Sequence, residues 1–371
     1  MEMIETGGAI ETPLAELHKR AGATLGTWFG CDLPDHWVDP RVEQEFARKS
    51  VALVDKNYRA YLNFTGPDRV RYLNAILTNN IKDLPVGQGN ISLLLNPQGH
   101  ILAEIESYAQ PDSLFCITFA MIRERLIEWL DRYIIMDEVT LSDESQRYGT
   151  LGLEGPQAAV VARELTGVDL FAIAELSRVE TAVASIPCWL TKRSPGGVAG
   201  CEFLAEREKL AGLWQILLDN VKKHGGGTMG YAALSAQRLA QGVPWFGYDF
   251  GEKQIPHEAG LEASHISYTK GCYTGQEIVE RVRSRGQVNR RRVDLIFEGA
   301  GVPAAGETLT ADGKEVGFVT RAAIPSFLSS AIGMAYVRKD HNAAGSRLSW
   351  SGGAAVVSKF PEALAVAAAV R

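Results

Sequence analysis

The sequence predicts an α+β protein in which two mixed lobes are followed by a small all-β barrel. Three observations favour this fold class: the length of 371 residues, a strand–Gly-Pro–helix unit that occurs twice, and a run of short strands after Arg292. A chain of this length exceeds what one ordinary hydrophobic core holds. We therefore expect residues 1–285 to form two intertwined α+β lobes and residues 286–371 to form the barrel.

Strand and helix patterns alternate in the first part of the chain. Thr12 and Pro13 are expected to open a short helix that Gly22 ends, with Thr12 as its N-cap, because proline suits the first helical position. The segment 65–68 (TGPD) opens a second helix that ends near Thr78. The other elements expected here are strands at 59–64, 91–95, 101–108 and 114–119, a turn at 96–99 and a helix at 122–135.

The strand–Gly-Pro–helix unit then recurs. Residues 153–156 (LEGP) open a helix that ends near Thr166, much as residues 64–67 (FTGP) open the earlier one. This repetition indicates an internal duplication of an α+β lobe, and the alternative is chance, since Gly-Pro commonly opens helices. Two further helices are expected at 206–223, where apolar residues recur at 3.6-residue spacing, and at 231–240.

The last part of the chain has the pattern of short strands. They are expected at 293–297, 307–310, 315–320, 331–337, 347–350 and 354–360. Asp312-Gly313 and Gly352-Gly353 stand where two-residue hairpin turns are needed. This part therefore predicts a small barrel, and the alanine-rich tail after Pro361 is expected to be a short helix or disordered.

Composition and charge are those of an ordinary globular protein, with 46% hydrophobic residues, 22% charged residues and a net charge of -6. Direct binding of nucleic acid is not expected, and any anion would need a local basic patch. Neither a secretory signal nor an apolar stretch of about 20 residues occurs, so no membrane span is expected. The five cysteines are scattered without metal spacing, which predicts the reducing cytoplasm, no disulfide framework and no preformed metal site.

The segment 270–277 (KGCYTGQE) is the most informative for chemistry. Cys272 lies between two glycines, beside Lys270 and close to a possible helix start, where a thiol would be partly ionised at neutral pH. Such a thiolate could bind a soft metal or react with an electrophile. The alternative is a buried cysteine that acts as a small apolar residue.

Two other features suggest ligand contacts. Six arginines lie within residues 281–292 and form either a local anion site or a solvated face; RNA is less favoured because no stacking aromatic lies among them. Glu202 follows a glycine-rich turn and could accept paired hydrogen bonds from a planar amino-heterocycle, or could be an ordinary exposed strand residue. His100 and His265 stand alone, which is typical of structural hydrogen bonding.

Motifs spread over nearly the whole chain match one known family. They lie at residues 12–14, 16–19, 53–55, 65–68, 77–79, 93–96 with Gly99, and 256–261. On these residues the chain resembles the glycine-cleavage T-protein (aminomethyltransferase) superfamily. The KGCYTGQE segment resembles the signature of the superfamily's YgfZ branch, which includes iron–sulfur assembly factors. The T-protein itself lacks the cysteine at this position.

The resemblance implies a T-protein-like three-domain ring around a folate channel, with tetrahydrofolate as the ligand. It also implies a role in making or repairing iron–sulfur clusters, with effects on tRNA-modifying enzymes, and hence iron–sulfur client enzymes or assembly proteins as partners. Glu202 matches the family's pterin-binding glutamate, and Arg238 matches an arginine that lines the folate site. Cys272 matches the cysteine that the branch requires for function.

The remaining site residues come from the same segments. Lys270 is expected to act with Cys272, while Tyr273 and Gln276 are expected to contact the folate. The aminomethyltransferase carries two adjacent aspartates, one of them catalytic, where this chain has Ala103 and Glu104. Glu104 could still serve catalysis, although its longer side chain shifts the carboxylate by about one C–C bond. The sequence thus predicts a folate-binding accessory protein, and the alternative is a folate-dependent aminomethyltransferase.

Overall fold

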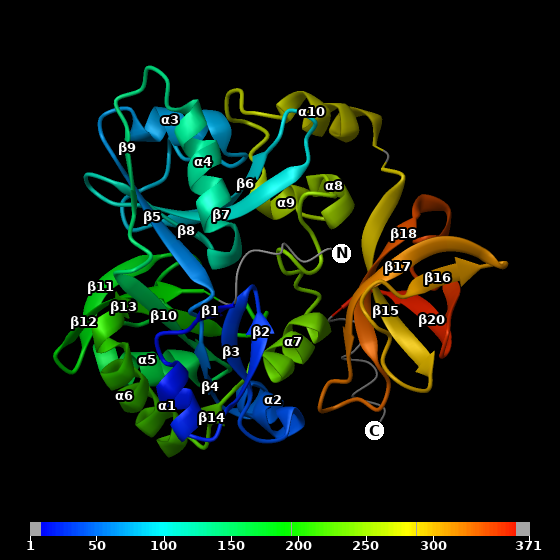
Figure 1. Ribbon diagram of the computed structural model, residues 1–371, viewed down its shortest axis with the longest axis horizontal. Helices are drawn as coiled ribbons and strands as arrows, with labels where there is room; N and C mark the ends of the chain where they lie inside the picture. Colours follow the sequence, from blue (N-terminus) through cyan, green and yellow to red (C-terminus); the bar gives the residue numbers. More distant parts are fainter. Residues whose placement is uncertain (1–8, 194, 287, 361–371) are drawn as a thin grey trace.

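Two α+β lobes and a closed barrel make up the computed structural model, which describes residues 9–193, 195–286 and 288–360. In Figure 1 the first lobe lies at the top, the second at the lower left and the barrel at the right. The predicted fold class is confirmed. The predicted alanine-rich tail after Pro361 lies outside the described residues.

The first lobe is built on a five-stranded sheet with the order β6-β7-β8-β5-β9. Its helices α3 (Arg69–Ile76) and α4 (Arg123–Tyr133) contribute Leu73 and Leu126 to the apolar core against the sheet. The strands are β5 (Arg59–Thr65), β6 (Gly89–Leu95), β7 (Ile101–Ala109), β8 (Leu114–Phe119) and β9 (Thr140–Asp143).

The second lobe repeats this arrangement. Its six-stranded sheet has the order β11-β12-β13-β10-β4-β14. In this sheet β10 lies beside the meander β11-β12-β13, just as β5 lies beside the meander β6-β7-β8 in the first lobe. Each first strand is followed by a helix, α3 or α5, and each meander by α4 or α6, which confirms the predicted repeat in topology. The elements are β4 (Ala52–Asp55), β10 (Tyr148–Glu154), α5 (Ala158–Thr166), β11 (Arg178–Val183), β12 (Ile186–Lys192), β13 (Gly200–Glu206), α6 (Leu210–Lys223) and β14 (Gly227–Thr228).

The N-terminal segment forms a small three-stranded sheet of its own, which the sequence did not predict. Helix α1 begins at Ala15 instead of at Pro13, with Leu14 and not Thr12 at the N-cap position. The Thr12 hydroxyl donates to Asp55 Oδ2 at 2.6 Å and accepts from the backbone N–H of Leu14 at 3.4 Å, so it lies just before the helix. The elements of the segment are β1 (Ile10–Glu11), α1 (Ala15–Arg20), β2 (Thr24–Trp28), β3 (Cys31–His36) and α2 (Pro40–Lys49).

The barrel closes in the order β15-β18-β17-β16-β19-β20. Asp312 and Gly313 have φ angles of 50° and 74°, which is the left-handed backbone that a two-residue hairpin needs. The strands are β15 (Arg290–Gly299), β16 (Thr308–Ala311), β17 (Lys314–Ala323), β18 (Ile332–Arg338), β19 (Arg347–Trp350) and β20 (Gly353–Ser358). The domain boundary expected after residue 285 lies between α10 and β15 and stays a prediction.

Four helices connect the second lobe to the barrel and pass the first lobe on the way. They are α7 (Tyr231–Ala240), α8 (Pro256–Ala259), α9 (Glu262–His265) and α10 (Gln276–Arg285). Within the described ranges, no helix is both long and apolar enough to cross a membrane. All five cysteines are free, and only Cys272 is exposed.

Asp55 anchors the N-terminal segment to the second lobe. Its carboxylate is 1% exposed and accepts from Thr12, from His18 Nε2 at 2.8 Å and from the backbone N–H of Asn57 at 2.9 Å. Burial alone would raise the pKa of Asp55, but the hydrogen bonds and the charge of His18 lower it overall. An aspartate with a depressed folded-state pKa stabilises the fold above its unfolded value and loses that contribution as the pH falls.

Asp55→Asn is therefore expected to destabilise the protein by about 2–3 kcal/mol at pH 7, because it removes a charge-assisted buried network. The difference from the parent should shrink below about pH 4, where the aspartate of the unfolded chain takes up a proton while the folded-state carboxylate, with its lowered pKa, still holds its charge. Urea unfolding followed by circular dichroism at pH 7 and pH 3.5 measures both values. Equal losses at the two pH values would contradict this account of the network.

Candidate functional site

A pocket of about 310 Å³ lies where both lobes, the N-terminal segment and the barrel meet. We call it the central pocket. Three aromatic residues form one wall: Phe29, Tyr58 and Phe119, with ring centroids 4.4 Å apart for the first pair and 5.6 Å for the second. The charged side chains that line it are Arg59, Glu104, Glu106, Arg193 and Arg292.

Phe29 reaches the pocket from the tip of the β2–β3 hairpin. Its φ angle is 53°, a left-handed backbone that a bulky residue rarely adopts, and Gly30 follows with φ 72°. The ring is 3% exposed and is held between Tyr58 and Trp245. Unfavourable backbone of this kind persists where the surrounding packing dictates it, and such residues cluster at functional sites.

Strand β7 places two carboxylates on the pocket side. Successive strand residues point to opposite faces, so Glu104 and Glu106 share one face while Ala103 and Ile105 share the other. The two apolar residues are buried in the core of the first lobe. The alternation of β7 thus explains why acidic side chains stand in a buried strand.

Glu106 is the centre of a buried charge cluster. Its carboxylate accepts from Arg193 at 2.9–3.0 Å, from Tyr108 Oη at 2.9 Å and from Arg59 Nη1 at 3.5 Å. Arg59 donates from Nη2 to Glu202 Oε1 at 2.9 Å and so joins two carboxylates from different lobes. Burial strengthens these pairs because little water screens them.

The two carboxylates of this cluster differ in acidity. Burial alone would raise the pKa of Glu106, but the charges of Arg193 and Arg59 lower it to about 2. For Glu202 burial is the larger influence, and it raises the pKa despite the nearby charge of Arg59. Glu106 is therefore firmly ionised. A new hydrogen-bond donor would stabilise the ionised form of Glu202 more than that of Glu106.

Glu104, predicted as catalytic, lies in the central pocket beside His265. His265 Nε2 is 2.8 Å from Glu104 Oε1, and Ser264, which also lines the pocket, contacts the other ring nitrogen. His265 was expected to make only structural hydrogen bonds; its partner turns out to be the candidate catalytic carboxylate. These two residues are 161 positions apart, so no local pattern could have paired them.

Two predicted folate residues lie behind the pocket surface. Glu202 is 4% exposed on β13 and contacts Arg59 instead of lining the pocket. Arg238 is fully buried on α7, paired with Asp249 and stacked 4.7 Å from the Trp245 ring. Its Nε and Nη2 atoms have no hydrogen-bond partner among the described residues. The predicted folate contacts of both residues stay predictions.

Lys270 anchors the loop that carries the predicted cysteine. Its Nζ donates to the carbonyl oxygens of Asn74, Leu77 and Asn79, which lie in and after the last turn of α3. A cation there complements the negative end of the helix. Burial lowers the pKa of Lys270 to about 8. The residue therefore holds the loop against the first lobe.

Cys272, Tyr273 and Gln276 occupy different environments along this loop. Cys272 is exposed, the Tyr273 side chain is buried 5.3 Å from Lys270, and Gln276 begins α10. None of the three lines the central pocket. Their predicted catalytic and folate roles stay predictions.

Two sequence motifs meet beside this loop. A Cβ atom on Gly275 would lie 2.6 Å from Asn96 O and 3.4 Å from the Cα of Gly99, and both glycines have positive φ. Only glycine permits this close approach of the KGCYTGQE segment to the β6–β7 turn. The loop with Cys272 therefore packs on the end of the hairpin whose second strand carries Glu104.

Two of the six arginines from position 281 onward pair with acids from other elements. Arg290 pairs with Glu258 at 3.2 Å and Arg291 with Glu262, both on the short helices α8 and α9. Arg292 bonds the carbonyl of Ala259 and reaches the central pocket. The sequence contained few acids among these arginines, and folding brings two acids to them, Glu258 and Glu262.

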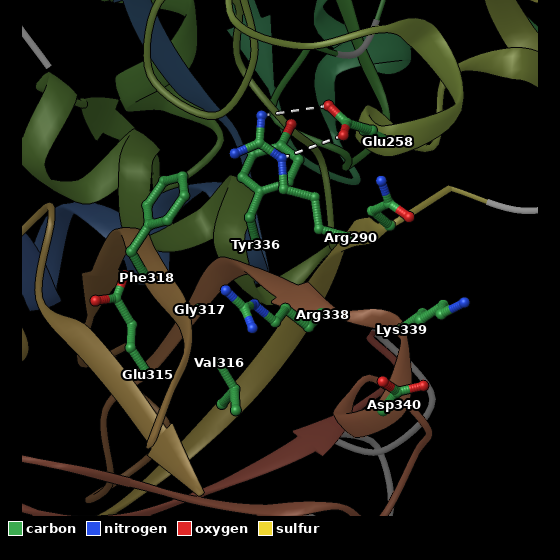
Figure 2. Close-up of a pocket in the computed structure, with 11 residues that line it drawn as sticks. Glu258, Arg290, Glu315, Val316, Gly317, Phe318, Tyr336, Arg338, Lys339 and Asp340 are labelled. Atoms are coloured by element: carbon green, nitrogen blue, oxygen red, sulfur yellow. Dashed lines mark hydrogen bonds and ion pairs between the residues drawn. The ribbon is translucent and has the colours of Figure 1, made fainter. Parts of the chain in front are cut away.

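A second cavity of about 630 Å³ lies between α8 and strands β15, β17 and β18 of the barrel. Figure 2 shows the Glu258–Arg290 pair above Tyr336, with Arg338 below. Although it is the larger of the two cavities, the only candidate site residue that lines it is Arg290, from the arginine cluster, and it opens on exposed barrel residues. Within the part of the chain that the structure describes, no group of three or more His, Cys, Asp or Glu residues could hold a metal ion. We take the central pocket as the candidate site.

The chain is similar to known proteins in sequence and in structure. Residues 14–266 match the family model described as the GCVT N-terminal domain, and residues 290–354 match the glycine cleavage T-protein C-terminal barrel domain. An aminomethyltransferase from Rubrobacter xylanophilus is 26% identical over 337 residues, covering 91% of this chain and 89% of that protein. One from Streptomyces coelicolor is 27% identical, covering 90% and 91%. The crystal structure of glycine cleavage system aminomethyltransferase T from Bartonella henselae superposes with a TM-score of 0.86 at 22% identity, covering 95% of this chain and 97% of that one.

Proposed function

Since the chain belongs to the glycine cleavage T-protein family, we propose that it binds a reduced folate, tetrahydrofolate, in the central pocket. One observation carries the proposal: a wall of stacked aromatic rings faces a buried cluster of carboxylates and arginines in the same cavity. Planar heteroaromatic ligands pack on such rings, and their polar edges pair with a few fixed charges. A folate has both a planar ring and a carboxylate tail.

The cluster offers a partner for each end of such a ligand. Glu202 lies behind the pocket surface on Arg59 and is proposed for the amino-heterocycle edge of a ligand that displaces Arg59. A carboxylate whose pKa is raised by burial gains most from a new pair of donors. Arg193 and Arg292 are proposed for a carboxylate tail, since both line the pocket. Tyr273 and Gln276 stay candidates for folate contact from the resemblance alone, since they lie on the loop that Lys270 holds against the first lobe.

Aminomethyl transfer is one candidate role for the bound folate. The similar proteins from Rubrobacter and Streptomyces are named aminomethyltransferases, which favours this reaction over the other candidate. Glu104, which stands at one of the family's two adjacent aspartate positions, lines the pocket with its carboxylate beside His265. An enzyme of this kind would lose turnover when Glu104 loses its charge.

A folate-binding accessory role for cytoplasmic iron–sulfur enzymes is the second candidate, and KGCYTGQE is the observation that favours it. Cys272 is the exposed cysteine of the chain, on a loop that Lys270 ties to α3. A single cysteine is too few for a cluster that needs four ligands, so contact with a cluster would be transient or shared with a partner protein.

Calorimetric titration of the pure protein with tetrahydrofolate tests the binding proposal. We expect saturable heat, and we expect Glu202→Gln to weaken affinity at least about tenfold by removing a charge-assisted acceptor. Glu206→Gln, at the exposed end of the same strand, is the matched control and should bind like the parent. Absence of heat with the parent would remove the proposal, and an unaffected Glu202→Gln would move the heterocycle edge elsewhere.

Cys272→Ala separates the two candidate roles. If the accessory role is correct, folate affinity should stay within about twofold of the parent, since the side chain lies outside the pocket, while the activity of client iron–sulfur enzymes falls in cells. Thr269→Ala, another exposed change in this loop, is the control. Full client activity in Cys272→Ala, together with methylene-folate formation from an aminomethyl donor, would decide for the transferase.

A further inference from the structure

Three side chains form a continuous hydrogen-bonded row that ends at the central pocket. Ser264 Oγ lies 2.7 Å from His265 Nδ1, and His265 Nε2 lies 2.8 Å from Glu104 Oε1. All three residues line the pocket, and they differ in exposure: His265 is 6% exposed, whereas Ser264 is open to solvent. The row thus runs from an accessible hydroxyl, through a buried imidazole, to a carboxylate.

The hydrogen bonds fix the direction in which a proton can move. An ionised carboxylate only accepts, so the Nε2 atom of His265 carries the hydrogen that faces Glu104. Nδ1 of the neutral ring is then an acceptor, and Ser264 donates to it. The other acceptor near this hydroxyl, Leu261 O, is more distant at 3.5 Å. In enzymes that activate a hydroxyl group, a base accepts the hydroxyl proton and a third side chain orients the base. Ser264, His265 and Glu104 have this arrangement.

Packing holds the row in place. Thr78 Oγ1 donates to the backbone carbonyl of His265 at 2.6 Å and accepts from Leu93 N on β6 at 2.8 Å, which ties α9 to the first-lobe sheet. The other charged groups around the pocket already have partners: Glu106 with Arg193 and Arg59, and Arg292 with Asp294. The row of Ser264, His265 and Glu104 therefore stands apart from these ion pairs at its end of the pocket.

We propose that Ser264, His265 and Glu104 form a proton relay for an amine-containing ligand in the central pocket. A protonated amine of the ligand gives its proton to Ser264 Oγ while the hydroxyl proton of Ser264 passes to His265 Nδ1. His265 then carries both ring hydrogens, and Glu104 stabilises the positive charge. The reverse transfer returns the proton to a departing amine, so the three side chains end unchanged. The relay rests on the proposed function, because reduced folates and their one-carbon donors are amines.

Nitrogen-15 NMR of the seven histidine rings tests the row without any ligand, with His265→Gln assigning the signals. We expect His265 at neutral pH to carry hydrogen on Nε2 and none on Nδ1. We also expect Glu104→Gln to change this pattern, while Ser267→Ala, a serine outside the pocket lining, leaves it intact. A ring that carries its hydrogen on Nδ1 would overturn the relay.

Kinetics of aminomethyl transfer provide the second readout. His265→Gln should lower kcat about 10²-fold and remove one limb of the pH–rate profile, and Ser264→Ala should lower kcat about tenfold because water can replace a hydroxyl. Tetrahydrofolate affinity should change less than about twofold in both variants. Unchanged kcat with intact binding, or a parent that binds folate without transfer, would overturn the relay alone. Absence of folate binding in the parent would instead overturn the proposed function.

Discussion

Lys56→Met is expected to destabilise the second lobe by about 3–5 kcal/mol, because it leaves the carboxylate of Glu154 buried without its counter-charge. The two side chains are each 1% exposed and lie 2.9 Å apart, and the second carboxylate oxygen already lacks a partner among the described residues. Burial raises the pKa of Glu154 even though Lys56 counteracts it. A carboxyl with a raised folded-state pKa stabilises the fold less as the pH rises, so the loss in the variant should grow from pH 5 to pH 8.

Urea unfolding at the two pH values measures this effect. The matched control is Lys19→Met, which removes an exposed lysine from its pairs with Glu11 and Glu16 and should not change stability measurably. The double variant Lys56→Met/Glu154→Leu should recover most of the loss, because it removes both buried charges together. A Lys56→Met protein as stable as the Lys19→Met control would contradict the buried pair.

Arg238→Met is expected to loosen the contact between helix α7 and the barrel, again at a cost of about 3–5 kcal/mol. Arg238 and Asp249 are both fully buried, and Asp249 also accepts from Thr320 on β17 at 2.6 Å. Arg238 itself contacts Met334 Sδ on β18 at 3.6 Å. Loss of the guanidinium leaves Asp249 without its counter-charge at this junction.

Limited proteolysis and thermal unfolding measure how far the contact between α7 and the barrel loosens. Calorimetry with folate, at a temperature below the unfolding transition, measures the effect on binding separately. Arg321→Met is the control, because Arg321 stands over the rings of Trp28 and Tyr248 at the same junction without a buried ion pair in the described structure. We expect Arg238→Met to lower stability far more than this control. Folded Arg238→Met protein with parental folate affinity would remove Arg238 from the predicted folate contacts, whereas a selective loss of affinity would restore it.

Secondary structure could be predicted closely where local signals were complete. Residues 231–240 were expected as a helix and 347–350 as a strand, and α7 and β19 have these bounds. The barrel strands were found because hairpin turns such as Asp312-Gly313 limit their length. Helix α2 was not among the predicted elements, although its local signal is present in the sequence, since Asp39 caps it and Pro40 opens it.

Site residues could be predicted singly but not as pairs. Glu104 and Glu202 were identified from their places in family motifs, yet their partners, His265 and Arg59, lie 161 and 143 residues away. Phe29 gave no signal at all, since its role depends on a hairpin tip that only packing against Tyr58 holds in place.

The sequence alone determined the α+β class, the repeated lobe, the barrel and the segments that carry the candidate residues. These depend on backbone preferences and hydrophobic periodicity, which act between neighbours in the chain. Only the tertiary structure decided that Lys270 anchors a loop, that Arg238 joins the barrel to α7, and that Glu104 meets His265. The physical reason is that a buried charge pairs with whichever group the folded chain brings close to it, because a carboxylate that is buried without a hydrogen-bond donor costs free energy.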